Sequence, residues 1–236
     1  MAKLPATKER KKNIKAGDGI FNHTKHFTPL TENQGWAKIQ YDKGFHLCML
    51  GYAGTGKTYM ALAFAIDELK ANTKRKIHIF RSAVASRDIG FLPGTIQEKM
   101  SVYETPYVGI VNEIVGRGDA YQMMKQKDVL QFESTSFLRG ITIDDAVVIV
   151  DEAQNLSQHE IDTLMTRLGE NTTVIFCGDI QQTDLMLHES GLRHLINVLK
   201  YMDDDFEVIN FDIEDIVRSG ICRRWIIARE RLKKAQ

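Results

Sequence analysis

The chain has 236 residues, of which 43% are hydrophobic and 26% charged, as expected for one sizeable globular α/β domain. Acidic and basic residues number 31 each, so overall charge gives no argument for a nucleic-acid partner. No apolar run approaches the roughly 20 residues that span a membrane, and the N-terminus has no secretory apolar core, so we expect a cytoplasmic protein without a membrane partner. Three widely spaced cysteines favour packing roles in a reducing compartment.

Both ends of the chain are basic. Residues 3–15 carry six basic residues against one acid, and Arg223–Lys234 carries another six against one. Solvated tails are the ordinary explanation, and contact with nucleic acid is the alternative. We expect residues 1–28 to form a basic, loosely ordered segment and residues 29–236 to form the folded domain.

From residue 44 onward, short apolar runs alternate with helical patterns. Residues 95–116 read as mostly helical, with Pro106 and Gly109 interrupting or bending the helix. A capping box at Ser157 and Glu160 opens a helix for which Gly169 suits the C-terminal turn. Alternating buried strands and helices predict an α/β fold, a single domain with a mostly parallel sheet flanked by helices. We expect strands at 45–50, 77–82, 146–152, 172–179 and 206–211, and further helices at 58–69, 157–169, 190–200 and 219–233.

The stretch "LGYAGTGKTYM" at Leu50–Met60 fits the phosphate-loop pattern G-x-x-x-x-G-K-[ST]. A predicted strand precedes it and a predicted helix follows, which is the setting that the motif requires. Lys57 would reach the β- and γ-phosphates, and the Thr58 hydroxyl would ligate Mg²⁺. Backbone N–H groups of the loop would approach phosphate oxygens. The nucleotide-binding residues expected here are Gly51, Ala53, Gly54, Thr55, Gly56, Lys57 and Thr58.

Two further strand ends carry candidate catalytic groups, because ligands of parallel sheets lie at the carboxyl ends of the strands. Asp151 follows "VVIV" and can hold Mg²⁺ through water, and the adjacent Glu152 can polarise the attacking water. Loop acids or helix caps are the plainer interpretation of such a pair. At the next strand end, "CGDIQQTDL", Gln182 (or less favourably Gln181) could place an amide near the γ-phosphate, and Asp179 could orient such groups.

Missing motifs narrow the class of protein. The chain has no [NT]-K-x-D guanine-reading motif and no L-S-G-G-Q of transporter ATPases, and small-molecule kinases usually lack the Asp-Glu pair. An ATPase with a RecA-like P-loop core remains, with ATP and Mg²⁺ as its cofactors.

The order and spacing of "GYAGTGKT", "GFLPGTIQEKM", "SFLRG", "VIVDEAQNLS", "CGDIQQTDL" and "DIVRSGI" resemble PhoH-family ATPases over about residues 28–230. That family is similar to the first RecA-like domain of superfamily 1 helicases and occurs in bacteria and phages. The resemblance implies that Gln34 in "TENQ" recognises adenine, with a turn amide as the alternative. It implies that Arg218 is a γ-phosphate finger acting across a subunit boundary, with a solvated helix-end arginine as the alternative.

Other arginines are candidates for nucleic-acid contact. Arg139 in "FLRG" could contact phosphate or nucleic acid, or could serve as a structural ion-pair partner. Arg81 and Arg87 lie in the stretch "RSAVASRDIGFLPG" (81–94), where this sequence departs from the family pattern.

The resemblance implies an ATPase that works on RNA or single-stranded nucleic acid, with possible helicase activity. A helicase closes two RecA-like domains around one ATP, and this chain has room for one. We therefore expect a ring-like homo-oligomer, with a hexamer favoured by the resemblance. The alternative is an ATP-dependent switch or scaffold that binds a protein partner without unwinding nucleic acid.

Overall fold

The computed structural model describes residues 19–82, 96–135, 140, 142–179 and 190–234. Within these residues six strands form one sheet in the order β3-β2-β4-β5-β1-β6, and every neighbouring pair is parallel. This topology confirms the predicted α/β P-loop fold of the RecA-like type, with β5 inserted between the phosphate-loop strand and the Asp-Glu strand. The strands are β1 (His46–Gly51), β2 (Lys76–Arg81), β3 (Leu130–Ser134), β4 (Ala146–Asp151), β5 (Thr173–Gly178) and β6 (Phe206–Phe211).

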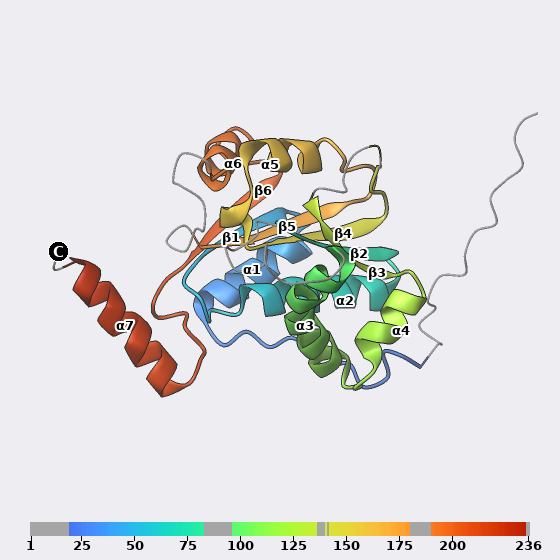
Figure 1. Ribbon diagram of the computed structural model, residues 1–236, viewed down its shortest axis with the longest axis horizontal. Coiled ribbons are helices and arrows are strands. Elements are labelled where there is room, and N and C mark those ends of the chain that lie inside the picture. The colour runs from blue at the N-terminus through green and yellow to red at the C-terminus, as the bar shows by residue number, and fades with distance from the viewer. Residues whose placement is uncertain (1–18, 83–95, 136–139, 141, 180–189, 235–236) are drawn as a thin grey trace, which may run out of the picture.

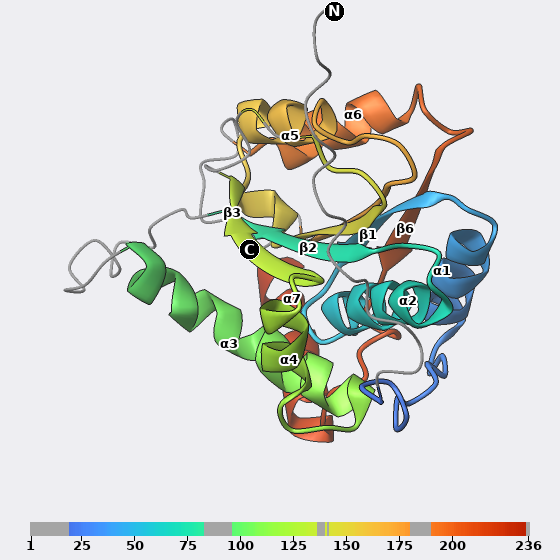
Figure 2. The same ribbon diagram turned by 90° about the vertical axis from the view of Figure 1, so that its right-hand side faces the viewer.

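Helices cover both faces of the sheet, so its central strands are apolar throughout. In β4, Val147 and Ile149 point to one core and Val148 and Val150 to the other, because successive side chains of a strand face opposite ways. Figures 1 and 2 show α5 and α6 on one face and α1 to α4 on the other. The bounds are α1 (Glu32–Asp42), α2 (Lys57–Ala71), α3 (Ile96–Val115), α4 (Ala120–Gln126), α5 (Gln158–Met165), α6 (Leu192–Leu199) and α7 (Gly220–Lys234).

Several elements differ from the sequence expectation. Helix α3 continues through Pro106 and Gly109, so neither residue interrupts it, which was one of the two expectations. Helix α5 ends at Met165, earlier than the predicted Gly169. The chain leaves the helix because the N–H of Gly169 donates to Ile143 O at 2.8 Å and not to a carbonyl of the preceding turn. The sequence interpretation missed α1, α4 and β3. None of the described helices is long and apolar enough to cross a membrane.

Core packing begins before the expected domain boundary at residue 28. Ile20, Phe21 and Phe27 are buried in the core on the α2 side of the sheet. The backbone N–H of Lys25 donates to Ile114 O at 2.7 Å, which holds this segment along the end of α3. Residues 19–28 are therefore part of the folded domain.

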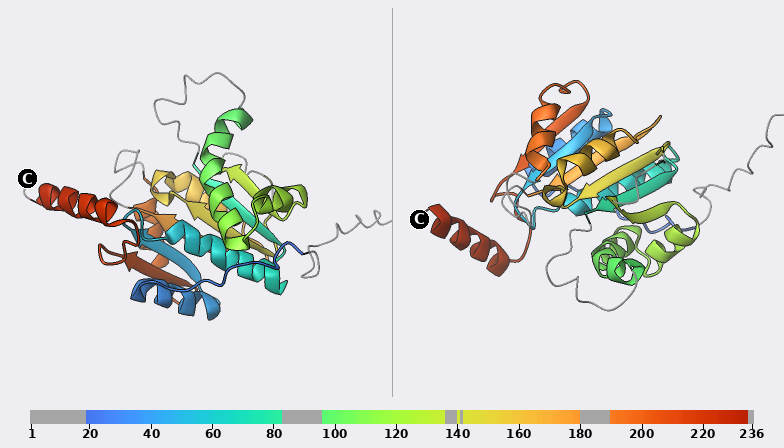
Figure 3. Two further views of the ribbon diagram at one scale, coloured as in Figure 1. Left: turned by 90° about the horizontal axis from the view of Figure 1, so that it is seen from below. Right: turned by 45° about the horizontal axis from the view of Figure 1, so that its top comes forward.

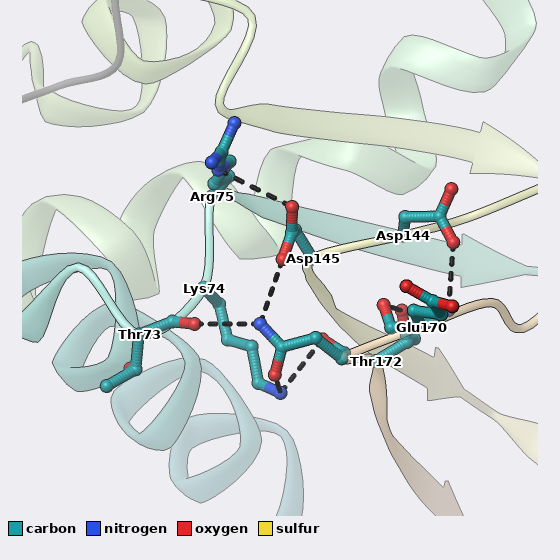
Figure 4. Close-up of polar contacts among 8 residues, drawn as sticks. Thr73, Lys74, Arg75, Asp144, Asp145, Glu170 and Thr172 are labelled. Carbon is teal, nitrogen blue, oxygen red and sulfur yellow. Dashed lines mark hydrogen bonds and ion pairs between the residues drawn. The ribbon is translucent and has the colours of Figure 1, made fainter.

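A polar network fixes the amino ends of β2, β4 and β5 (Figure 4). Lys74 Nζ donates to the backbone and side-chain oxygens of Asn171 at 2.9 and 2.7 Å. Asn171 Nδ2 donates to Thr73 O at 3.1 Å and to Asp145 Oδ1 at 2.9 Å, while Arg75 Nε lies 3.4 Å from Asp145 Oδ2. These contacts set the strand register at the edge of the sheet opposite the functional groups described below.

Candidate nucleotide site

The carboxyl ends of the central strands meet at one edge of the sheet and line a cavity of about 800 Å³. Register places Arg81 beside Asp151 and Leu50 beside Gly178, so the residues that end β1, β2, β4 and β5 lie together. The cavity wall includes most of the predicted site: Gln34, Ala53, Gly54, Gly56, Lys57, Thr58, Arg81, Asp151, Glu152, Asp179 and Arg218.

The phosphate loop requires glycine at two positions, each of which combines a positive φ with a close neighbour. A Cβ on Gly51 would lie 1.9 Å from Phe211 O, because β6 passes directly against this turn, and the φ of Gly51 is +135°. A Cβ on Gly54, whose φ is +83°, would lie 2.6 Å from Arg218 Cγ. Helix α2 begins at Lys57, directly after the loop, so its first N–H groups face the cavity, where an anion is favoured.

Lys57 is held inside the loop. Its Nζ donates to Gly51 O and Tyr52 O, both at 2.8 Å, and to Thr55 Oγ1 at 3.3 Å. Burial lowers the pKa of Lys57, while the acids of the cavity, among them Asp179 and Asp151, oppose that change. These three contacts use all three N–H donors of the ammonium group, so a bound phosphate would replace at least one of the loop oxygens.

Thr58 and Asp151, the two predicted Mg²⁺ ligands, are in contact. Thr58 Oγ1 donates to Asp151 Oδ1 at 3.0 Å, although 93 residues separate them. The second carboxylate oxygen, Oδ2, accepts from the hydroxyl of Tyr107 at 2.8 Å. Burial and the charge of Glu152 raise the pKa of Asp151, and the hydrogen bonds from Tyr107 and Thr58 counteract this rise. A hydroxyl and a carboxylate are hard oxygen ligands of the kind that Mg²⁺ takes beside nucleotide phosphates, so these residues fit that ion.

Glu152 adopts a backbone conformation that L residues rarely hold. Its φ is +52°, which costs about 1–2 kcal/mol for a residue with a Cβ. Its Oε2 accepts from Gln154 Nε2 at 2.5 Å, and Gln154 Oε1 accepts from the Asp179 N–H at 2.9 Å. Gln154 is buried and so links the strand end that carries the Asp-Glu pair to the neighbouring end of β5. Backbone strain of this kind concentrates at functional sites.

Arg81 faces the same acids. Burial lowers the pKa of Arg81, but Tyr107, Glu152 and Asp151 together raise it above its ordinary value. Its guanidinium carbon lies 5.0 Å from the ring centroid of Tyr103, so the side chain is held between α3 and the end of β2. The charge of Arg81 is directed into the cavity.

Gln34 connects α1 to the phosphate loop. Its Nε2 donates to Thr55 O at 3.0 Å, and its Oε1 accepts from the Leu30 N–H at 2.8 Å. A carboxamide has two N–H donors and two acceptor lone pairs, so one donor and one lone pair remain for a ligand.

Arg218 lies against the phosphate loop of its own chain. Besides the approach of its Cγ to Gly54, the N–H of the preceding Val217 donates to Gly54 O at 3.0 Å. Arg218 and its two neighbours in the chain are exposed, and Arg218 lines the cavity from the segment that follows β6.

Comparison with known proteins identifies the family. The family model described as "PhoH-like protein" matches residues 27–230. The chain belongs to the PhoH-like protein family. It is 35% identical to a PhoH-like protein of Bacillus subtilis over 184 residues, and the matched region covers 77% of this chain and 57% of that protein. It is 36% identical over 182 residues to protein PhoH of Escherichia coli K12, with 75% and 51% covered. The chain thus spans about half the length of these relatives.

Solved structures give weaker likenesses. The Pif1 helicase from Candida albicans superposes with a TM-score of 0.40 at 14% identity, covering 79% of this chain and 40% of that chain. The Sulfolobus solfataricus SWI2/SNF2 ATPase core in complex with dsDNA reaches 0.45 at 12% identity, with 81% and 46% covered. These low scores add nothing to the fold assigned from the sheet itself.

Membership of this P-loop family implies nucleotide binding. Three residues proposed from the sequence, Arg87, Arg139 and Gln182, lie outside the described residues. The sequence interpretation missed Tyr107 and gave Gln154 no role. No motif marks Tyr107, which reaches Asp151 only through packing of α3. Gln154 stands in the "DEAQ" stretch, so its place beside the acids was a signal that could have found it.

Proposed function

We propose that this PhoH-like chain is a Mg²⁺-dependent ATPase. The observation that carries the proposal is the 3.0 Å contact between Thr58 Oγ1 and Asp151 Oδ1, with Lys57 and Glu152 on the same cavity. Mg²⁺, when bound, would neutralise the negative charge that develops during transfer of the phosphoryl group. Lys57 would bind the β- and γ-phosphates, and Thr58 and Asp151 would hold the ion, Asp151 through water.

Glu152 is the proposed base. It would accept a proton from the attacking water, and Gln154 holds its carboxylate by a hydrogen bond to Oε2. The side-chain amide of Gln182 would contact the γ-phosphate and so sense whether that phosphate is present. We expect Glu152→Gln to abolish hydrolysis while ATP binding persists. Retained turnover in this variant would reject the base assignment, and loss of ATP binding would show that the change disturbs the site itself.

Gln34 would give the site a preference for ATP over other nucleotides. Its unused amide hydrogen and lone pair match the acceptor N7 and the donor N6 of adenine. We expect Gln34→Ala to raise the Kd for ATP and to reduce the discrimination between ATP and GTP. Equal affinities of the unaltered chain for both nucleotides would contradict this role.

Arg218 is proposed to contact the γ-phosphate. Its contact with Gly54 supports a contribution within its own chain, whereas the family resemblance implies one across a subunit boundary. Mixing Arg218→Ala chains with Lys57→Ala chains separates these possibilities. Restored hydrolysis would require the arginine of one subunit to serve the cavity of another, and no restoration would place the arginine in cis.

The proposed substrate is RNA or single-stranded nucleic acid, and the proposed assembly is a ring-like homo-oligomer, with a hexamer favoured. Support comes from the helicase-like family resemblance and from Arg87 and Arg139. Arg81 faces the acids of the nucleotide cavity, which favours a role there over contact with nucleic acid. The decisive assay is ATP hydrolysis with and without RNA or single-stranded DNA, on protein of measured mass. No stimulation, together with salt-independent affinity, would favour an ATP-dependent switch that binds a protein partner.

A further inference from the structure

Helix α7 presents an apolar face that no described part of the chain covers. Ile221, Trp225 and Leu232 are 68%, 72% and 61% exposed, and their spacing of four and seven residues places them on one side of the helix. We call these three residues, with the flanking Arg224 and Arg231, the α7 face. Figures 1 and 3 show α7 extending away from the sheet, and α7 makes no extensive contact with any other described helix or strand.

A surface of matching chemistry lies at the end of α6 and on the turn between α6 and β6. Tyr201 is 90% exposed and Val198 40% exposed, and three consecutive exposed acids follow them. We call Val198, Tyr201, Asp203, Asp204 and Asp205 the α6–β6 patch. It pairs two apolar side chains with negative charge, as the α7 face pairs apolar side chains with positive charge.

The two surfaces lie apart within one molecule, as the positions of α6 and α7 in Figures 1 and 2 show. The α6–β6 patch precedes the first residue of β6, and the segment leading to α7 leaves from the last, about 17 Å away at the usual rise per strand residue. That segment is also anchored: Asp215 Oδ2 accepts from Asn33 Nδ2 at 2.7 Å and from the Asp212 N–H at 2.9 Å, and Val217 N–H donates to the phosphate loop. Helix α7 is therefore held at the opposite end of β6 from the patch.

We propose that the α7 face of one copy docks on the α6–β6 patch of a second copy of this chain. A contact between two different surfaces of identical chains is head-to-tail, and it closes into a ring if the rotation permits. The contact would bury Trp225 and Tyr201 at its centre, with arginines opposite aspartates at its rim, which is the usual composition of a protein interface. Helix α7 begins two residues after Arg218, so docking would also fix the arginine that lies on the phosphate loop.

This inference deepens the proposed oligomer and rests on that part of the proposed function. The test is sedimentation velocity of the full chain over a range of concentrations, without nucleotide or RNA. We expect a species larger than the 26.9 kDa chain. Reversing the α7 rim with Arg224→Glu and Arg231→Glu should weaken self-association at least tenfold, because like charges would then face each other. Reversing the patch with Asp203→Arg and Asp204→Arg should do the same.

Combining both reversals should restore the larger species, which a merely unfolded variant would not do. Lys70→Glu, the same kind of charge change at an exposed position of α2, is the matched control and should leave the mass unchanged. Trp225→Ala should dissociate the assembly without any charge change.

The outcomes separate the two proposals. A chain that is monomeric at every concentration overturns both the ring and the docking contact. An oligomer that survives both reversals overturns the docking contact alone. Reversals that change binding to RNA or to phosphatidylglycerol vesicles but leave the mass unaltered overturn it in favour of those partners. Restored assembly in a chain without ATPase activity supports the docking contact and overturns the catalytic proposal.

Discussion

Replacing Tyr107 by phenylalanine tests whether the hydrogen bond to Asp151 organises the proposed metal site. Tyr107 is 1% exposed, and its hydroxyl donates to Asp151 Oδ2 at 2.8 Å. A hydrogen bond to a charged group contributes about 1.5–3 kcal/mol, so Tyr107→Phe should lower the free energy of unfolding by that amount. Loss of a partner that orients a metal ligand typically costs about 10- to 100-fold in metal affinity or activity.

The assay is steady-state ATP hydrolysis at saturating ATP over a range of Mg²⁺ concentrations. We expect Tyr107→Phe to need more Mg²⁺ for half-maximal activity, while ATP binding measured without Mg²⁺ stays unchanged. Because Asp151 keeps its bond from Thr58, high Mg²⁺ should recover much of the activity.

Tyr121→Phe is the matched control. Tyr121 is also buried, and its hydroxyl donates to a carboxylate, Glu104 Oε1, at 2.6 Å, but it does not line the cavity. The Tyr121→Phe variant should lower the free energy of unfolding by an amount comparable to Tyr107→Phe, with no change in the Mg²⁺ concentration needed for half-maximal activity. Equal effects of the two variants on Mg²⁺ dependence, or no effect of Tyr107→Phe, would refute the reasoning.

Three further predictions concern the scaffold. Gly51→Ala should lower the free energy of unfolding by about 1–3 kcal/mol or more, because its Cβ would meet Phe211 O. Thermal denaturation tests this against Gly118→Ala, whose added Cβ would lie in open space. Equal melting temperatures of the two variants would contradict the prediction. Burial lowers the pKa of His46, whose Nδ1 accepts from the Val174 N–H at 3.3 Å. The unfolded chain therefore binds more protons, and stability should be full above pH 6.5 and fall as the pH drops below it. Urea denaturation between pH 5 and 8 should show a flatter profile for His46→Gln, and an unaltered profile would exclude His46 as the cause. Asn171 has a φ of +52°, and its side chain donates to Thr73 O and to Asp145 Oδ1. Asn171→Ala should lower the free energy of unfolding by about 1–2 kcal/mol, and Asn171→Gly by less, since glycine keeps the backbone conformation. The reverse order would disprove the backbone contribution.

Local patterns were sufficient for much of the fold. The continuous β-branched run of β4 and the phosphate loop between β1 and α2 were found because each signal lies within a few adjacent residues. Helix α1 was missed although its signal is present: Thr31 caps the helix by accepting from the Gln34 N–H, a pattern visible in "TENQ". Strand β3 pairs with β2 at the edge of the sheet, and its short apolar run did not stand out from its surroundings.

The sequence by itself determined the chemistry that contiguous residues encode: the glycine loop, Lys57 and Thr58, and the acids Asp151 and Glu152 after a buried strand. Only the tertiary structure decided which distant groups meet them. Tyr107 reaches Asp151 across 44 residues, Gln34 reaches Thr55 O, and Arg218 packs on Gly54. The physical reason is that such contacts depend on strand register and helix packing between distant segments, and neither leaves a periodic trace in the local sequence. The exposed α7 face belongs to the same category, because an apolar helical stripe indicates burial but does not say against what.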